Sequence, residues 1–178
     1  WPGLKRNDAD WYAAEIMDYI LGGGSFSSRL MKEIREKRGL TYGVNSGSSA
    51  LEHGPLFTVE ASFQGKNAAE VLRLINEEVA RMVKDPVSAE ELKAAKDYLI
   101  GSAPLDLTST SNIAGRYLGL RLNGLPMDEE EKRAKALQAV TAADVQRVAK
   151  RIFSVQPAVF FVGNPEGITP TETFDKID

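Results

Sequence analysis

His53 is the single histidine of this 178-residue chain, and the sequence contains no cysteine. A zinc site needs about three protein ligands from histidine, cysteine, aspartate or glutamate, usually in a local motif. Neither His-Glu-x-x-His nor the inverted His-x-x-Glu-His is present. The same count rejects a serine-histidine-aspartate triad, because His53 would have to be its base. We therefore interpret His53 as an exposed turn residue, and we expect neither a metal ligand nor a catalytic residue in this chain.

Two further patterns have the residue types of a site but lack its context. The glycine run at 22–24, followed by Ser25, has the composition of a phosphate-binding loop. It lacks the Gly-Lys-Ser/Thr ending and follows no predicted strand, so we interpret it as a flexible loop or a point of close backbone packing. The acidic run at 128–131 suits the positive end of a helix dipole. We read it as a solvated helix start, with partner contact as the alternative.

The composition is that of a globular domain, with 43% hydrophobic residues, 26% charged residues and a formal net charge of −3. This balance gives no electrostatic reason to expect nucleic acid or an anionic membrane as a partner. No apolar run approaches the roughly 18 residues that span a bilayer. The chain starts with Trp1 rather than methionine, so we expect a fragment or a processed form of a longer protein.

The first part of the chain has helical periodicity. Apolar residues recur at helical spacing over 10–21, where Asp8 or Asp10 is the candidate N-cap. They recur again over 28–38, and Gly39 is placed to end that helix in a left-handed conformation. Two consecutive helices are therefore predicted.

A period of two follows and predicts an antiparallel hairpin. Residues 41–50 alternate so that Tyr42 and Val44 fall on the same side, and residues 56–63 alternate in the same way. The Glu-His-Gly-Pro sequence at 52–55 supplies the turn between the two strands.

The remainder is predicted to be mostly helical. Helices are expected at 67–84, 88–103, 109–125, 128–139 and 141–152. The Ser-Ala-Glu-Glu sequence at 88–91 matches a capping box, and Thr141 is the expected cap of the last helix. The apolar run at 158–162 has the pattern of a central strand that is buried on both faces.

This order of elements predicts an α+β fold in which an antiparallel sheet has helices packed on one face. Three strands make a thin sheet, so we expect a further strand upstream of Trp1. Without that strand the sheet has an exposed edge that invites pairing with another chain. We place the domain at 1–165, followed by a polar tail at 166–178.

The segment at 22–46 carries a family resemblance. It reads GGGSFSSRLMKEIREKRGLTYGVNS: a glycine-rich turn, a Ser-Arg-Leu helix, and an Arg-Glu-Lys-Arg-Gly-Leu-Thr-Tyr stretch that enters a strand. This segment resembles the second, inactive domain of the pitrilysin/insulinase family, which includes mitochondrial processing peptidase. The segments 2–21, 86–92 and 140–145 resemble the same domain in the same order. The resemblance covers about 1–165 and implies the processing-peptidase, LuxS-like metallohydrolase fold.

The resemblance also implies a binding role for two residues. In that family a first domain of the same fold holds zinc in a His-x-x-Glu-His motif, and an arginine and a tyrosine of the second domain reach the bound peptide near the zinc. The matching residues here, seven positions apart, are Arg35 and Tyr42. A tyrosine hydroxyl can donate to the oxyanion that forms when water attacks a peptide carbonyl. An arginine fork can hold a neighbouring carbonyl, and the strand at 42–48 could offer an edge to an extended peptide.

Plainer readings exist for these side chains. Arg35 could pair with Glu33 or another acid on the surface, and Tyr42 could be a half-buried strand aromatic. Arg38 is a competing arginine, only four positions from Tyr42. Arg29 is read as part of a helix surface.

The function that the resemblance implies is a non-catalytic, substrate-binding domain or subunit of a zinc-dependent peptidase. Its partners would be a zinc-bearing homologous domain or subunit, as in a heterodimer, and an extended peptide, with no nucleic acid and no membrane. Zinc would be the cofactor of the partner, with none in this chain. The alternatives are the second half of a single-chain zinc protease, a structural scaffold subunit, and a binding module outside this family. A bacterial partner subunit would be periplasmic; otherwise we expect a cytoplasmic protein.

Overall fold

The computed structural model describes residues 1–51 and 53–173, so Glu52 of the predicted turn and residues 174–178 of the predicted tail lie outside the described residues. Within them the strands and α-helices are β1 (Thr41–Ser49), β2 (Leu56–Phe63), α1 (Trp11–Asp18), α2 (Ala68–Lys84), α3 (Ala89–Gly101), α4 (Thr110–Leu122), α5 (Glu129–Ala139) and α6 (Ala142–Ile152). Shorter π-helical and 3₁₀-helical segments are Tyr19–Gly23, Ser25–Ser27, Met31–Glu36, Gly65–Asn67 and Ala103–Leu107. No helix in the described part is long and apolar enough to cross a membrane.

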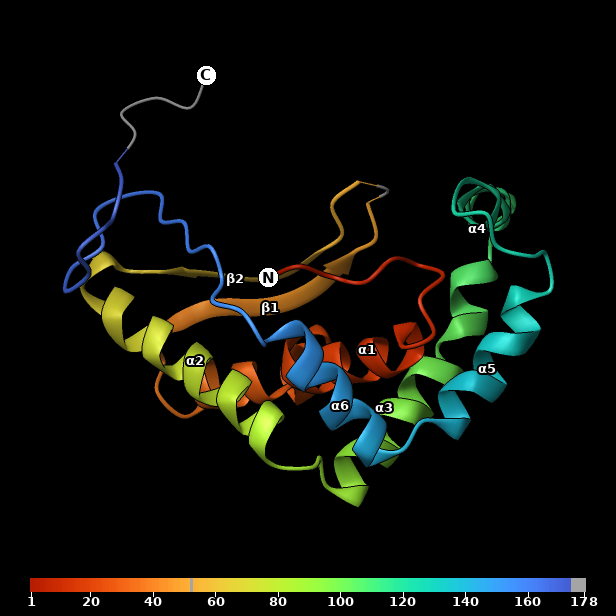
Figure 1. The fold of residues 1–178 in the computed structure, drawn as a ribbon, viewed down its shortest axis with the longest axis horizontal. Helices are drawn as coiled ribbons and strands as arrows, with labels where there is room; N and C mark the ends of the chain where they lie inside the picture. Colours follow the sequence, from red (N-terminus) through yellow and green to blue (C-terminus); the bar gives the residue numbers. More distant parts are fainter. Residues whose placement is uncertain (52, 174–178) are drawn as a thin grey trace.

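The sheet in the described residues is one antiparallel hairpin, formed by β1 and β2. Figure 1 shows the hairpin above a layer that contains α1, α2 and α6, with α4 and α5 at one end of the molecule. The predicted α+β class, with antiparallel strands and helices packed on one face, is confirmed.

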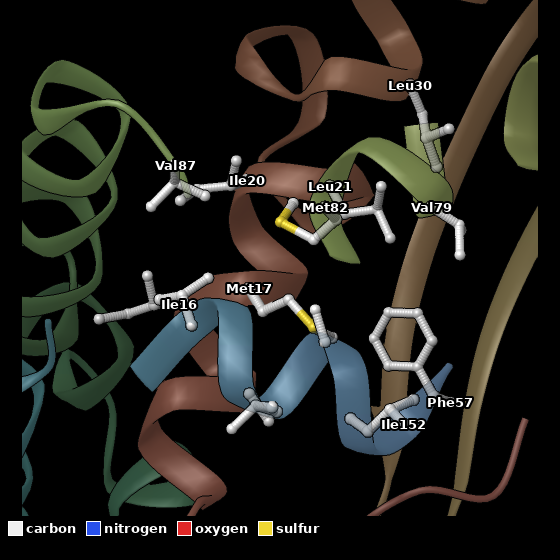
Figure 2. Close-up of a cluster of buried hydrophobic side chains, with 14 of the residues drawn as sticks. Ile16, Met17, Ile20, Leu21, Leu30, Phe57, Val79, Met82, Val87 and Ile152 are labelled. Carbon is white, nitrogen blue, oxygen red and sulfur yellow. The ribbon is translucent and has the colours of Figure 1, made fainter. Parts of the chain in front are cut away.

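The hydrophobic core lies between the hairpin and the helices. Figure 2 shows Phe57 of β2 beside Ile152 of α6, with Met17 of α1 close to both. All three side chains are buried. Burying a side chain of this size stabilises the fold by ~1.5–3 kcal/mol. These contacts therefore hold the hairpin on the helical layer.

The predicted helix caps are correct for α3 and α6 but wrong for α1. Ser88 and Glu91 form a complete capping box at the start of α3, and Thr141 caps α6 in the same way. Neither Asp8 nor Asp10 gives α1 a side-chain cap. Their carboxylates instead bind arginines of α6. The reason is that α6 presents cations to this loop, and ion-paired carboxylates are no longer directed at the helix start.

The predicted strand at 158–162 is not a strand in the structure. Phe160 is 83% exposed and Val162 is 97% exposed, so the segment is not buried on both faces. A strand requires a neighbouring backbone for its N–H and C=O groups, and no backbone hydrogen bond joins this segment to β2 within the described residues. Its apolar sequence alone does not supply that neighbour.

Candidate functional site

Arg35 lies on the π-helical segment Met31–Glu36, and its guanidinium lies over two aromatic rings. Its guanidinium carbon is 4.5 Å from the centroid of the Phe26 ring and 5.1 Å from that of the Tyr42 ring. Tyr42 is 87% exposed and Phe26 is 58% exposed. Cation–π contacts of this kind orient an arginine while leaving its N–H groups available. The three side chains form one accessible cluster, which we call the Arg35 stack.

A β-bulge points Tyr42 outward. Thr41 pairs with Phe63 and Gly43 pairs with Ser62, so two steps along β1 face a single step along β2. Bulges commonly re-aim a side chain. Alternation would have placed Tyr42 in the same row as Val44, which is buried. The reading of Tyr42 as a half-buried strand aromatic is therefore wrong.

The buried hydroxyl of Thr41 supports this bulge. Its oxygen lies 2.7 Å from the carbonyl oxygen of Gly43 and 2.6 Å from that of Ser62, and it accepts the Gly43 N–H at 3.1 Å. An irregular strand leaves backbone groups without ladder partners, and a side-chain hydroxyl can satisfy them. Thr41 thus holds the backbone on which the Tyr42 side chain stands.

The glycine run positions Phe26 through close backbone packing. A β-carbon on Gly22 would lie 2.5 Å from the Ser46 nitrogen, and one on Gly24 would lie 2.6 Å from the Tyr19 carbonyl oxygen. The chain then turns through Ser25, which has a φ of 51°. Of the two readings of this run, close packing is the one the structure supports.

The same packing covers the outer edge of β1. Gly22 lies against the backbone of Ser46, and the Val44 N–H points to the sulfur of Met31 at 3.5 Å. An extended peptide cannot pair with β1 at these two residues without displacing the helical layer. The suggestion of a peptide-binding edge over 42–48 is therefore not supported at Val44 and Ser46.

The neighbouring charges leave Arg35 outside the local ion pairs. Glu33 accepts hydrogen bonds from Lys37 and Arg38, which hold the pKa of its carboxyl below the ordinary value. Among the described residues Arg35 forms no ion pair with a carboxylate. The alternative pairing of Arg35 with Glu33 is thus wrong. Arg38, the competing arginine, is the one that is bound to Glu33.

Arg29 has a structural role, not the surface role expected from the sequence. Its guanidinium makes two hydrogen bonds to the Glu91 carboxylate, at 2.7 and 2.8 Å. This fork lowers the pKa of Glu91 to about 2. Glu91 also belongs to the capping box of α3. The pair therefore fastens the helical segment that carries Arg35 to α3.

The remaining candidates form no site. His53 is exposed, as expected. Within residues 1–51 and 53–173, no group of three His, Cys, Asp or Glu side chains could hold a metal ion. In the acidic run, Glu129 is buried and accepts a hydrogen bond from the Tyr12 hydroxyl. The interpretation of that run as fully solvated is wrong at Glu129, because it packs against α1.

Sequence reasoning missed two residues of this region, Phe26 and Thr41. Phe26 stands in a Gly-Ser-Phe-Ser stretch, and no periodic pattern of residues predicts the conformation of that turn. Thr41 precedes Tyr42 directly, but the alternating pattern does not indicate the bulge that its hydroxyl supports. A glycine at position 43 is the one available signal, since glycine within a strand often marks a bulge.

Comparison with known proteins gives consistent matches. The family model described as "Peptidase M16 inactive domain" matches residues 1–99. An uncharacterized zinc protease of Streptomyces coelicolor is 32% identical over 91% of this chain and 35% of its own length. A Helicobacter pylori protein named a non-peptidase homolog is 30% identical over 89% of this chain and 37% of its own length.

Solved structures agree with the sequence matches. The crystal structure of a peptidase M16 inactive domain from Pseudomonas fluorescens superimposes with a TM-score of 0.77 at 32% identity. That alignment covers 84% of this chain and 36% of the other chain. The present chain thus spans little more than a third of the length of the curated relatives cited above.

Proposed function

Because the chain belongs to the peptidase M16 inactive-domain family, we propose that it is the non-catalytic, peptide-binding part of a zinc-dependent peptidase. No set of residues in the described part fits a zinc ion. The zinc would therefore be held by a homologous domain or subunit that faces this one. This chain would contribute binding groups to the peptide bound at that zinc.

The exposed Arg35 stack is the observation that carries the proposal. Arg35 is oriented by Phe26 and Tyr42 and is not bound to a carboxylate among the described residues. An arginine in this state can give a fork of N–H donors to a peptide carbonyl. The Tyr42 hydroxyl, on an outward-pointing side chain, can donate to a developing oxyanion. Both roles are chemically complementary to a peptide and require no metal in this chain.

Two arrangements would place a zinc-bearing partner opposite the Arg35 stack. In the first, this chain belongs to a separate subunit of a heterodimer, in the periplasm if the protein is bacterial. In the second, the zinc-bearing domain belongs to the same polypeptide. The Streptomyces coelicolor relative, named a zinc protease and almost three times as long as the aligned region, favours the second arrangement. The Helicobacter pylori relative, named a non-peptidase homolog, favours the first or a scaffold role.

The test is steady-state hydrolysis of a fluorogenic peptide by the assembled peptidase. We expect Tyr42→Phe to lower kcat by roughly a hundredfold, because a donor to the oxyanion is lost. We expect Arg35→Ala to raise KM by roughly tenfold through loss of charge-assisted hydrogen bonds. The zinc content should not change in either variant.

Arg38→Ala is the matched control, since Arg38 is a neighbouring surface arginine that is bound to Glu33. Its kcat/KM should equal that of the unaltered protein. If Arg35→Ala and Tyr42→Phe are both as active as Arg38→Ala, the proposed role of the stack is wrong.

A further inference from the structure

A small cavity beside α1 has charged groups of both signs in its wall, and no residue of the Arg35 stack lines it. Its volume is about 220 Å³. Sites for drug-sized ligands have volumes of ~300–1,000 Å³, so this cavity has room only for a small molecule. Its polar wall comes from the N-terminal segment, α1, β1, α4 and α5, and consists of Arg6, Glu15, Asp18, Ser48, Arg116 and Arg133.

Arg6 presents a guanidinium that is held in place but weakly bound. It lies over the rings of Trp11 and Tyr12, at 4.9 and 5.4 Å from their centroids, and its side chain is 15% exposed. Its contact with Glu129 is 3.7 Å, which is longer than an N–H···O hydrogen bond. The Tyr12 hydroxyl donates to the same oxygen of Glu129. Because an arginine carries five N–H donors, Arg6 can still give a fork of donors to a carboxylate.

Asp18 is the anion of the wall that lacks a cation. The Ser46 hydroxyl donates to its carboxylate, but in the described part of the chain no ion pair joins Asp18 to an arginine or lysine. Burial raises the pKa of this carboxyl, and the nearby charge of Glu15 raises it further. Glu15 itself is paired with Arg133. A positively charged group inside the cavity would therefore balance Asp18.

We propose that this cavity binds a free α-amino acid in its zwitterionic form. The α-carboxylate would accept hydrogen bonds from Arg6, and the α-ammonium group would lie against Asp18. An α-amino acid carries both charges on one carbon atom, which suits a small cavity with one weakly bound cation and one anion without a cation. Glu15 and Arg133 would keep each other as partners.

The pairing of the two charges favours a free amino acid over a residue inside a peptide. Within a peptide the α-amino and α-carboxyl groups are converted to neutral amides, so neither Arg6 nor Asp18 would meet a backbone charge. This separates the cavity from the Arg35 stack, which under the proposed function holds the neutral backbone of a peptide. The cavity proposal can therefore be tested without any measurement of hydrolysis.

A second cavity adjoins the first and would receive the side chain of the amino acid. Its volume is about 360 Å³, and it shares Arg116 and Arg133 with the first cavity. Leu99, Leu105 and Leu107 contribute to its wall. Burial of apolar surface is favourable in proportion to the area removed from water. We therefore expect leucine to bind more tightly than glycine.

Isothermal titration calorimetry of the unaltered chain with leucine and two analogues tests the proposal. Leucinamide lacks the carboxylate, and N-acetyl-leucine lacks the ammonium group. Each should bind roughly tenfold more weakly than leucine or worse, because a charge-assisted hydrogen bond is lost. Absence of leucine binding at millimolar concentration would overturn the proposal. An analogue that binds as tightly as leucine would overturn it too, because the cavity would then recognise only one of the two charges.

Two variants assign each charge to its residue. Arg6→Met keeps an apolar chain over the rings of Trp11 and Tyr12, and we expect it to abolish the preference for leucine over leucinamide. Asp18→Asn keeps an acceptor for Ser46, and we expect it to abolish the preference for leucine over N-acetyl-leucine. If both variants retain both preferences, the assigned cavity is wrong.

Asp97→Asn is the matched control, because Asp97 is an exposed acid on α3 that pairs with Lys93 and lines neither cavity. Its affinity for leucine should equal that of the unaltered chain. Circular dichroism shows whether each variant is folded. If Arg6→Met or Asp18→Asn does not fold, the comparison of leucine with its two analogues on the unaltered chain still decides the proposal.

Discussion

The two outer edges of the hairpin carry the same backbone groups but meet different surroundings. The edge of β1 is covered by the turn containing Gly22 and by Met31. Among the described residues the edge of β2 is paired at its start, where Trp1 and Pro2 meet Phe57 and Leu56. The difference follows from what each edge lies beside. A glycine lets a helical layer approach a backbone closely, whereas a strand edge without such a layer leaves its N–H and C=O groups open to solvent or to another chain.

This comparison also separates the two exposed aromatic regions. Tyr42 is exposed beside the covered edge, with its backbone held by Thr41 and its ring against Arg35. Phe160 is exposed beside the open edge, on a segment without regular secondary structure. Under the proposed function Tyr42 contributes to ligand binding, whereas Phe160 has no role in it. The following predictions test this division, in order of decreasing effect.

Gly22→Val should be the most damaging change. Its first side-chain atom would lie 2.5 Å from the Ser46 nitrogen, so the turn that contains Gly22 must move away from β1. Overpacking of this kind costs ~3 kcal/mol or more of unfolding free energy, measured by urea denaturation. Gly47→Ala is the control, because a β-carbon there meets nothing within 4 Å. Equal losses in the two variants would show that the close approach is unimportant.

Thr41→Val should loosen the bulge. The Gly43 N–H loses its acceptor in a buried setting, at a cost of ~1–2 kcal/mol. Urea denaturation gives the loss, and NMR relaxation of the assigned Tyr42 ring reports its greater freedom. Thr58→Val on β2 is the matched control, since that hydroxyl makes only one 3.5 Å contact. A smaller loss for Thr41→Val than for Thr58→Val would contradict this role.

Acid should weaken the Arg29–Glu91 pair, which fastens the helical segment that carries Arg35 to α3. Arg29 lowers the pKa of Glu91 to about 2, from an ordinary value of 4.5. The contribution of a carboxylate with a lowered pKa is complete above its unfolded pKa and is lost as the pH falls toward the folded one. The stability difference between the parent and Glu91→Gln should therefore be constant above pH ~5 and shrink between pH ~4.5 and ~2. Urea midpoints across this range measure it, and a flat difference would exclude the pair as the cause.

Phe160→Ser should have the smallest effect. The ring is 83% exposed, so the unfolding free energy should change by less than ~0.5 kcal/mol. Phe161→Ser should cost about 1 kcal/mol more, because Phe161 packs against Phe63. Differential scanning calorimetry resolves the two. A large loss for Phe160→Ser would contradict the exposed position of this ring.

Local sequence signals predicted those elements whose stabilising contacts are close in sequence. The Ser88 capping box, the Thr141 cap, the end of the second helix at Gly39 and the hairpin were all predicted correctly. Each depends on residues within one turn or on one alternating pattern. The α1 cap failed because its aspartates bind arginines more than 130 positions away along the chain. The strand at 158–162 failed because a strand is defined by its neighbour and not by its own residues.

The sequence by itself determined that this chain has a single histidine and no cysteine, that its fold is α+β, and that Arg35 and Tyr42 stand seven positions apart. Only the tertiary structure decided that these two side chains meet, that Phe26 completes their stack, and that a bulge points Tyr42 outward. The physical reason is that composition and periodicity report local preferences. The direction of a side chain, and the free or covered state of a strand edge, depend on packing between segments that are distant in sequence.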